Sequence, residues 1–160
     1  MIIDTTQSTL FDFRVTGQVN LKLWRDGKLI DERNNHNLVM SVGRNYIANR
    51  IAKNTGDSGG VVIVSHMGIG TGSAGPTDDT KTALVTPTGA RQPLTSTTVT
   101  NNQVTYVGEF LPAVGSGDIV EAGIFNDVSA GTMVARTTFG VITKVLNSDK
   151  LTLTWTLTVS

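Results

Sequence analysis

Apolar and polar side chains alternate strictly in the last eleven residues of the chain. The apolar positions are Leu151, Leu153, Trp155, Leu157 and Val159, and the positions between them are Thr152, Thr154, Thr156 and Thr158. Because successive side chains of a β-strand point to opposite faces, this alternation predicts a strand with one buried face. The threonine face carries none of the charges that protect an exposed strand, so we expect the strand to lie inside a sheet or to face a partner.

Similar patterns predict strands elsewhere, separated by turn-forming residues. Two hairpins are expected, one turning at Asp26 and Gly27 and the other at Asn101 and Asn102, because these residue types accept the backbone geometry of tight turns. The other predicted strands cover residues 61–72, 118–125, 132–142 and 151–159. Short strands at this spacing are typical of a β-sandwich or a jelly roll.

The period changes at residues 41–53, where apolar side chains recur at helical spacing and Ser41 can cap the first turn. This stretch predicts one helix. A further helical turn or two is expected after Pro76, because the acidic pair Asp78 and Asp79 suits a helix N-terminus. The same pair could contact calcium, although capping already explains it.

Together these elements predict a mainly β protein, an antiparallel β-sandwich or jelly-roll-like single domain with one short-to-medium α-helix. Residues 17–160 form this domain, and residues 1–16 are either an N-terminal arm or a first strand. The candidate core residues are Tyr46, Ile51, Tyr106, Phe125, Phe139 and Trp155.

The N-terminal stretch carries three large apolar side chains, Leu10, Phe11 and Phe13, in a polar setting rich in threonine. No matching strand lies close in sequence. Two interpretations remain open: an arm that docks on a neighbouring copy, or a first strand whose phenylalanines enter the core. With the four threonines of the closing strand, these three residues form the candidate interface.

The composition argues against several function classes. The 160 residues include 13 basic and 13 acidic side chains, so the formal net charge is +0 at pH 7. A neutral chain has no long-range field to draw it onto nucleic acid or a membrane, and we expect neither as a partner. Cysteine is absent, which removes disulfides, thiolate nucleophiles and cysteine-bound metals. We also expect no signal peptide and no membrane span.

Candidate chemistry is sparse. The glycine-rich residues 68–75 lack both the strand–turn–helix context of a dinucleotide loop and the lysine of a phosphate-binding loop. His36 and His66 have no second ligand at a spacing typical of zinc. Glu109 and Glu121 could hydrolyse a glycosidic bond if they faced each other, but solvent-facing or ion-paired carboxylates need no special geometry. We therefore predict no catalytic, cofactor-binding or metal-binding residue.

Several segments carry a resemblance when they are read in order. They are residues 37–48, residues 66–72 followed by 76–84, residues 121–126, residues 132–139 and the closing strand. In this order they resemble a family of small virion structural proteins of tailed bacteriophages. Lys81 and Thr82 are additions to the family's Asp-Thr-Ala-Leu element, so this loop is expected to be reshaped.

The resemblance implies a non-enzymatic β-rich module that is present in several copies around the symmetry axes of a virion. We expect a capsid decoration (cement) protein that binds the phage major capsid protein from outside, made in the host cytoplasm and located in the virion. The alternative is a tail fibre or baseplate module that contacts host glycans through loops such as residues 54–60. A homotrimer is the expected assembly, since capsids offer three-fold sites. A glycan-acting enzyme that uses Glu109 and Glu121 is the competing hypothesis from another class.

Overall fold

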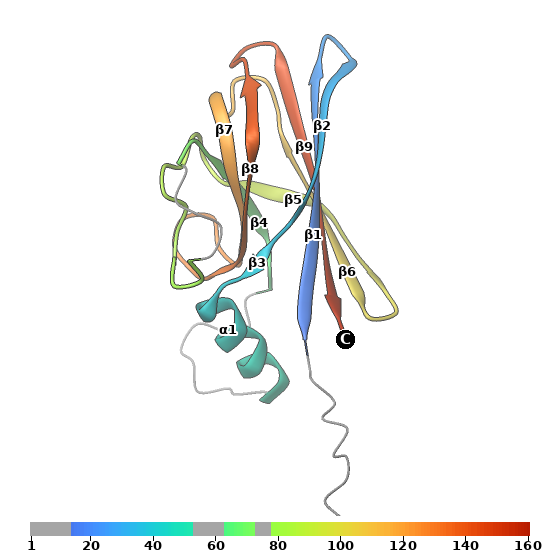
Figure 1. The fold of residues 1–160 in the computed structure, drawn as a ribbon, viewed down its shortest axis with the longest axis vertical. Helices are drawn as coiled ribbons and strands as arrows, with labels where there is room; N and C mark the ends of the chain where they lie inside the picture. Colours follow the sequence, from blue (N-terminus) through green and yellow to red (C-terminus); the bar gives the residue numbers. More distant parts are fainter. Residues whose placement is uncertain (1–13, 53–62, 73–77) are drawn as a thin grey trace, which may run out of the picture.

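The computed structural model describes residues 14–52, 63–72 and 78–160, which form nine strands and one helix (Figure 1). The elements are β1 (Val15–Arg25), β2 (Lys28–His36), β3 (Leu38–Val39), α1 (Ser41–Ala52), β4 (His66–Gly70), β5 (Gln92–Thr100), β6 (Gln103–Phe110), β7 (Gly117–Phe125), β8 (Met133–Lys144) and β9 (Asp149–Val159). The predicted mainly β architecture with antiparallel strands and one helix is confirmed. Within these ranges, no helix is long and apolar enough to cross a bilayer.

The strands form one sheet in the order β2-β1-β9-β6-β5-β4-β7-β8-β3, which folds over on itself and is nearly closed. Strands β1, β2, β6 and β9 make one layer, β4, β7 and β8 make the other, and β5 crosses between them (Figure 1). The start of β5 pairs with β4, and from Leu94 onward β5 pairs with β6. Side chains bridge the gap between β2 and β8, where the Asn35 amide donates to Thr137 Oγ1 at 3.1 Å and to the Thr138 carbonyl.

Both predicted hairpins form at their predicted turns. Asp26 (φ 50°) and Gly27 (φ 75°) connect β1 to β2, and two successive positive φ angles match the twist of the flanking strands. Asn101 (φ 52°) begins the turn between β5 and β6. These turns set the register of two of the strand pairs, because the loop length fixes which residues face each other.

Strand β9 lies between β1 and β6, inside the sheet as its alternation predicts. Leu151, Leu153 and Trp155 on its apolar side are fully buried. The threonine side of β9 is half-buried along its whole length. It lies on the outer face of the layer, so it does not pack against a second sheet of the same chain.

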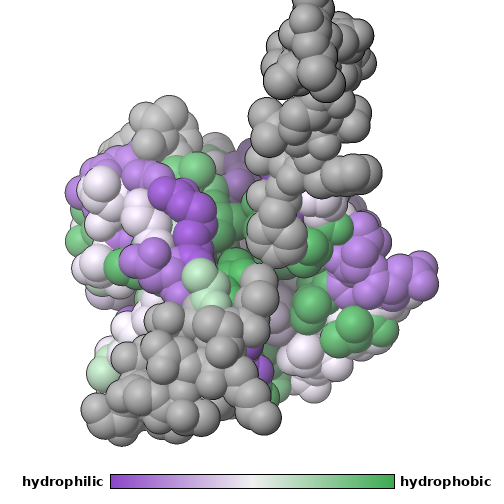
Figure 2. Space-filling view, turned by 90° about the horizontal axis from the view of Figure 1, so that it is seen from below, coloured by the Kyte–Doolittle hydropathy of each residue, from purple (hydrophilic) through white to green (hydrophobic). Residues whose placement is uncertain are grey.

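The apolar sides of the two layers meet in one main core, which includes Trp155, and a smaller cluster of Met40, Leu84, Phe125 and Met133 lies beside it. Of the candidate core residues, Trp155 and Phe125 are buried, Tyr46, Tyr106 and Phe139 are half-buried, and the side chain of Ile51 lies outside the described part. At the end of the molecule where α1 and the start of β1 lie, apolar surface gathers near the centre of the view (Figure 2).

The helical turn expected after Pro76 is a wrong prediction over the described residues 78–85, which form turns and bends. Asp78 Oδ1 accepts a hydrogen bond from Thr80 N at 3.1 Å, and Asp78 forms an ion pair with Lys81 at 3.3 Å. This hydrogen bond has the pattern of an N-cap, but no helix follows it: the next residues bend, and the Asp79 side chain is bound by Arg44.

Strand β2 extends further than its short apolar pair suggests, through polar residues to His36. It is an edge strand, where polar and charged side chains are favourable because they discourage pairing with other chains. The predicted strand at residues 61–72 corresponds to β4, with residues 61 and 62 outside the described part.

Candidate functional site

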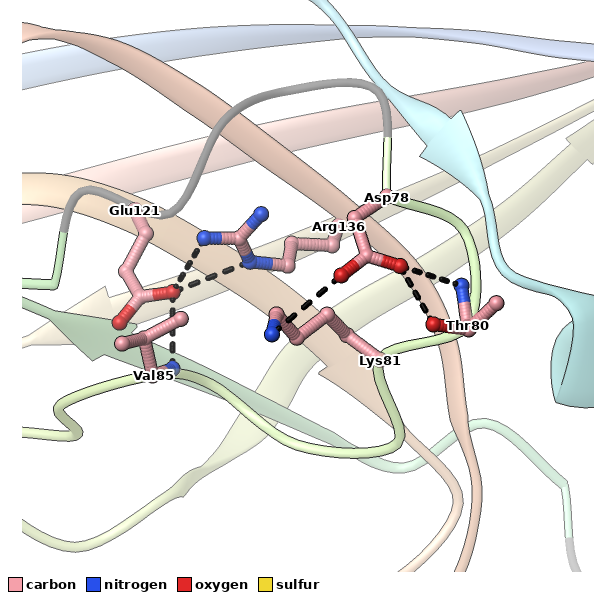
Figure 3. Close-up of polar contacts among 6 residues, drawn as sticks. All are labelled: Asp78, Thr80, Lys81, Val85, Glu121 and Arg136. Carbon is pink, nitrogen blue, oxygen red and sulfur yellow. Dashed lines mark hydrogen bonds and ion pairs between the residues drawn. The ribbon is translucent and has the colours of Figure 1, made fainter.

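Residues from two of the motifs form a buried ion pair that binds the loop directly after a third motif (Figure 3). The side chain of Glu121 on β7 is 0% exposed and that of Arg136 on β8 is 3% exposed. Arg136 Nε and Nη2 donate to Glu121 Oε2 at 3.0 and 2.8 Å. The backbone N–H groups of Val85 and Thr86 donate to the same carboxylate at 3.1 and 2.9 Å. Glu121 thus fastens the loop that follows Leu84 to the sheet.

Gly70 on β4 makes room for this carboxylate. A Cβ atom at this position would lie 2.6 Å from Glu121 Oε1 and 2.6 Å from the Thr86 carbonyl oxygen. Thr71 N donates to that carbonyl at 2.9 Å, so the loop runs along β4 as a short extension of the sheet. The glycine is therefore required for close packing of backbone and carboxylate.

Gly43 and Arg44 fix α1 against the rest of the domain. A Cβ atom on Gly43 would lie 2.0 Å from the Val134 carbonyl oxygen, so the helix backbone touches β8 directly. Arg44 Nη2 donates to Asp79 Oδ2 at 2.7 Å, and Nη1 donates to the Val39 carbonyl at 3.0 Å. The Arg44 guanidinium holds the pKa of Asp79 below its usual range. Asp79 therefore joins the loop to α1.

The two candidate glycosidase carboxylates do not face each other. Glu109 on β6 forms an ion pair with Lys150 at 3.0 Å on the outer face of its layer. Glu121 lies on β7, with β5 and β4 between the two strands. The side chain of Ala122 points into the core, so that of its neighbour Glu121 points to the outer face of the layer that contains β7. There it binds the loop. The pair thus lacks the facing geometry that glycoside hydrolysis requires.

The histidines are also separate. His66 Nδ1 lies 2.8 Å from Ser65 Oγ, and His36 is an exposed residue at the end of β2. Among the described residues, no group of three or more His, Cys, Asp or Glu side chains is arranged to hold a metal ion.

A second ion pair orders the end of the sheet near the start of β9. The Asp149 carboxylate is fully buried and accepts from Arg25 Nε and Nη2, both at 2.7 Å. Val145 N and Ser148 Oγ add bonds at 2.9 and 2.8 Å. These donors, with Arg25 first, hold the pKa of Asp149 far below its usual range.

Lys144 is a buried cation at the end of β8, with 1% of its surface exposed. Its Nζ donates to the carbonyl oxygens of Leu111 and Gly115 at 3.2 and 3.0 Å. Burial lowers the pKa of Lys144, and the nearby charge of Asp149 opposes this shift. The ammonium group therefore holds the β6–β7 connection against β8 and stabilises the fold.

The candidate interface threonines of β9, Thr152, Thr154, Thr156 and Thr158, share one broad polar face with residues of β1 and β6. Gln18 and Asn20 lie opposite Thr156 and Thr154 on β1, and Thr105 Oγ1 on β6 lies 3.2 Å from Thr156 Oγ1. We call this surface the polar face. Its centre offers hydroxyl and amide groups without a net charge. The other candidate interface residues, Leu10, Phe11 and Phe13, lie outside the described part of the chain.

An apolar pocket of about 610 Å³ lies between the start of β1, the β2–β3 junction and α1. Its apolar walls come from Val15, Leu38, Val39, Ile47 and Ala48. We call it the end pocket, because it lies at the end of the molecule shown in Figure 2. No pattern in the sequence indicates this pocket, since its walls belong to elements whose proximity follows from the closure of the sheet.

Asn37 lines the end pocket and has a buried amide group without hydrogen bonds to the described residues. Its Oδ1 and Nδ2 are buried without a hydrogen-bond partner among the described residues. The side chain lies against Gly17, where a Cβ atom would be 1.8 Å from Oδ1. An unpaired buried amide costs roughly 1–3 kcal/mol, so this position is a candidate for binding rather than for stability.

Comparison of the chain with protein-family models, with curated proteins and with solved structures finds no match. The resemblance to virion proteins therefore depends on the motif residues themselves. Gly43, Gly70, Glu121 and Arg136 each belong to one of those motifs, and each holds two or more segments of the domain together.

Proposed function

We propose that this chain is a non-enzymatic structural protein of a bacteriophage virion, a capsid decoration protein that binds the outer shell as a homotrimer and stabilises it. The observation that carries the proposal is the junction at Glu121 and Arg136. There, two motif residues on neighbouring strands hold the loop after residue 84 to the sheet. The residues that carry the resemblance to virion proteins thus stabilise the domain, as expected for a structural protein.

Two unlike surfaces support an assembly role. The polar face is broad, half-exposed and rich in hydroxyl groups, whereas the end pocket is concave and apolar. A decoration protein needs one surface for its own copies and another for the shell. We assign the end pocket to contacts between copies, because apolar surface suits permanent interfaces, and the polar face to the shell.

The test uses particles of a phage whose copy of this gene has been deleted. Purified protein is added to these particles, and binding is measured by co-sedimentation and cryo-electron microscopy. We expect regular density on the outer shell and a higher temperature of capsid disruption. Immunogold labelling of tails alone, or the absence of the protein from wild-type particles, would contradict the proposal.

A matched pair of variants tests the polar face. Thr154→Lys should abolish binding to the shell, because it places a charge at the centre of the polar face. Val141→Lys is the control, since Val141 is 52% exposed on β8, in the other layer of the sheet. Equal binding of both variants would remove the polar face from the proposal.

One observation favours the second candidate, a tail fibre or baseplate module. A surface pocket of about 480 Å³ combines the indole of Trp24 with Asp26, Asn147, Ser148 and Lys150. An aromatic ring beside hydroxyl, amide and charged groups suits a sugar ring and its hydroxyls. Binding to a glycan array that Trp24→Ala abolishes would support this candidate. The loop expected to contact glycans, residues 54–60, lies outside the described part.

A further inference from the structure

We propose that the end pocket receives residues 10–13 of a second copy of this chain. The inference rests on the proposed assembly function and deepens it, because it names the partner and the surface through which copies join. It makes the candidate interface residues Leu10, Phe11 and Phe13 one half of a contact, of which the end pocket is the other half.

The pocket has the chemistry of a site for large apolar side chains. Five apolar residues form its walls, and its volume of about 610 Å³ lies in the range of pockets that enclose a ligand. The polar lining residues His36 and Arg44 lie among them. Because Arg44 is already paired with Asp79, apolar side chains fill the pocket best.

Residues 10–13 match this chemistry. Three of its four side chains, Leu10, Phe11 and Phe13, are large and apolar. The segment is also attached at the correct place. Arg14 exchanges two backbone hydrogen bonds with Ser160, at 2.7 and 2.9 Å, and the next three residues of the chain, 15–17, form a wall of the end pocket.

The geometry points to another copy rather than to the same chain. Since residues 15–17 are themselves a wall, the preceding residues of the same chain would have to reverse direction at once to enter. Phe13 and Arg14, which directly precede this wall, are not among the residue types that favour tight turns, namely Gly, Pro, Asn, Asp and Ser. A segment from a neighbour enters without a reversal, and mutual exchange of such segments closes under rotational symmetry.

Asn37 gives an independent reason to expect a peptide in the pocket. Asn37 lines the pocket, and neither its amide donor nor its amide acceptor has a partner within the part of the chain that the structure describes. A peptide group offers one donor and one acceptor, which is the complement of a carboxamide. An extended segment in the pocket would therefore supply the partner that this side chain lacks, after a change of its rotamer.

The absence of native cysteine permits a direct test by disulfide trapping on the full-length chain. One preparation carries Phe11→Cys, and a second preparation, with a size tag, carries Ala48→Cys. The two are mixed and exposed to oxidised glutathione. We expect a covalent heterodimer that contains one chain of each kind. The control replaces the second variant by Val141→Cys, on an exposed part of β8 away from the pocket lining, and should give no such product.

The double variant with Phe11→Cys and Ala48→Cys in one chain separates the alternatives. Covalent multimers are expected, whereas a disulfide within one chain would overturn the inference in favour of a folded-back segment. Absence of any trapped product would overturn it as well.

Light scattering gives a second measurement that does not depend on the disulfide. Phe11→Ser combined with Phe13→Ser, and separately Ala48→Glu on the exposed side of α1, should lower the measured mass to that of one chain while the circular dichroism spectrum stays unchanged. An unchanged mass in both variants would contradict the inference. These results come from purified protein, so they are distinguishable from a failure of capsid binding: copies can join through the pocket even if the virion role is wrong.

Discussion

Arg136 Nη2 lies 2.8 Å from Glu121 Oε2, and both side chains are buried, on the adjacent strands β8 and β7. Because the same carboxylate accepts two backbone N–H groups of the loop after Leu84, this contact joins two strands and a loop. Burying two charges is tolerated only when their hydrogen bonds are made within the protein. The ion pair therefore stabilises the contact between β7, β8 and this loop.

Glu121→Gln should destabilise the domain by roughly 3–5 kcal/mol, because it removes the carboxylate charge opposite a buried guanidinium. Urea unfolding followed by tryptophan fluorescence measures the loss. Glu109→Gln is the control, since its ion pair with Lys150 is about one-third exposed, and it should cost less than about 1 kcal/mol. Similar losses in the two variants would show that the Glu121 pair has no special role.

Gly70→Ala should destabilise the domain by about 1–3 kcal/mol, since the added methyl group overlaps the Glu121 carboxylate and the Thr86 carbonyl. Gly140→Ala is the matched control on β8, where a Cβ atom meets nothing within 4 Å. The control should be neutral or stabilising by up to about 1 kcal/mol. Thermal unfolding of the two variants decides this, and a neutral Gly70→Ala would contradict the packing described for the loop.

Trp155→Ala should lose about 3–5 kcal/mol, because it empties the centre of the main core. Trp155→Phe should lose clearly less, since it keeps most of the apolar volume and removes an indole Nε1 that has no partner among the described residues. Guanidinium unfolding of the two variants measures the difference. A loss for Trp155→Phe as large as for Trp155→Ala would mean that the indole N–H does bind a partner.

Acid should destabilise the domain partly through Asp149. Its pKa is lower in the folded protein than in the unfolded chain, so the unfolded chain binds more protons at acidic pH. The stabilisation is therefore complete above the unfolded Asp pKa of about 3.9 and is lost progressively as the pH falls below it, toward the folded pKa.

Asp149→Asn checks this linkage by thermal unfolding at a series of pH values. The variant should be less stable at neutral pH, and its melting temperature should fall less steeply in acid than that of the parent protein. Asp78→Asn is the comparison, because Asp78 also has a lowered pKa but forms an exposed ion pair. Parallel acid curves for the Asp149 variant and the parent protein would contradict the assignment.

Local patterns predicted most of the strands because their signals are short-range. The alternation around Trp155 and the positive-φ turn at Asp26 and Gly27 depend on neighbours in sequence. The segment at Asp78 was misjudged for the opposite reason. Its acidic residues suit a helix start, but Asp78 is used by its own turn and Asp79 by Arg44, which lies 35 residues earlier in the chain.

The candidate site shows the same division. The sequence by itself determined the antiparallel β class, the hairpins, the helix near Ser41 and the two-faced closing strand, because backbone sterics and the period of side-chain burial act over a few residues. The pairing of Glu121 with Arg136, the outward position of the threonine side of β9 and the end pocket were decided by tertiary structure alone. The ion pair depends on the register of β7 against β8, which shifts next to Glu121. The threonine face and the end pocket depend on which strands become neighbours when the sheet folds over on itself, and the summed packing of the whole core makes that choice.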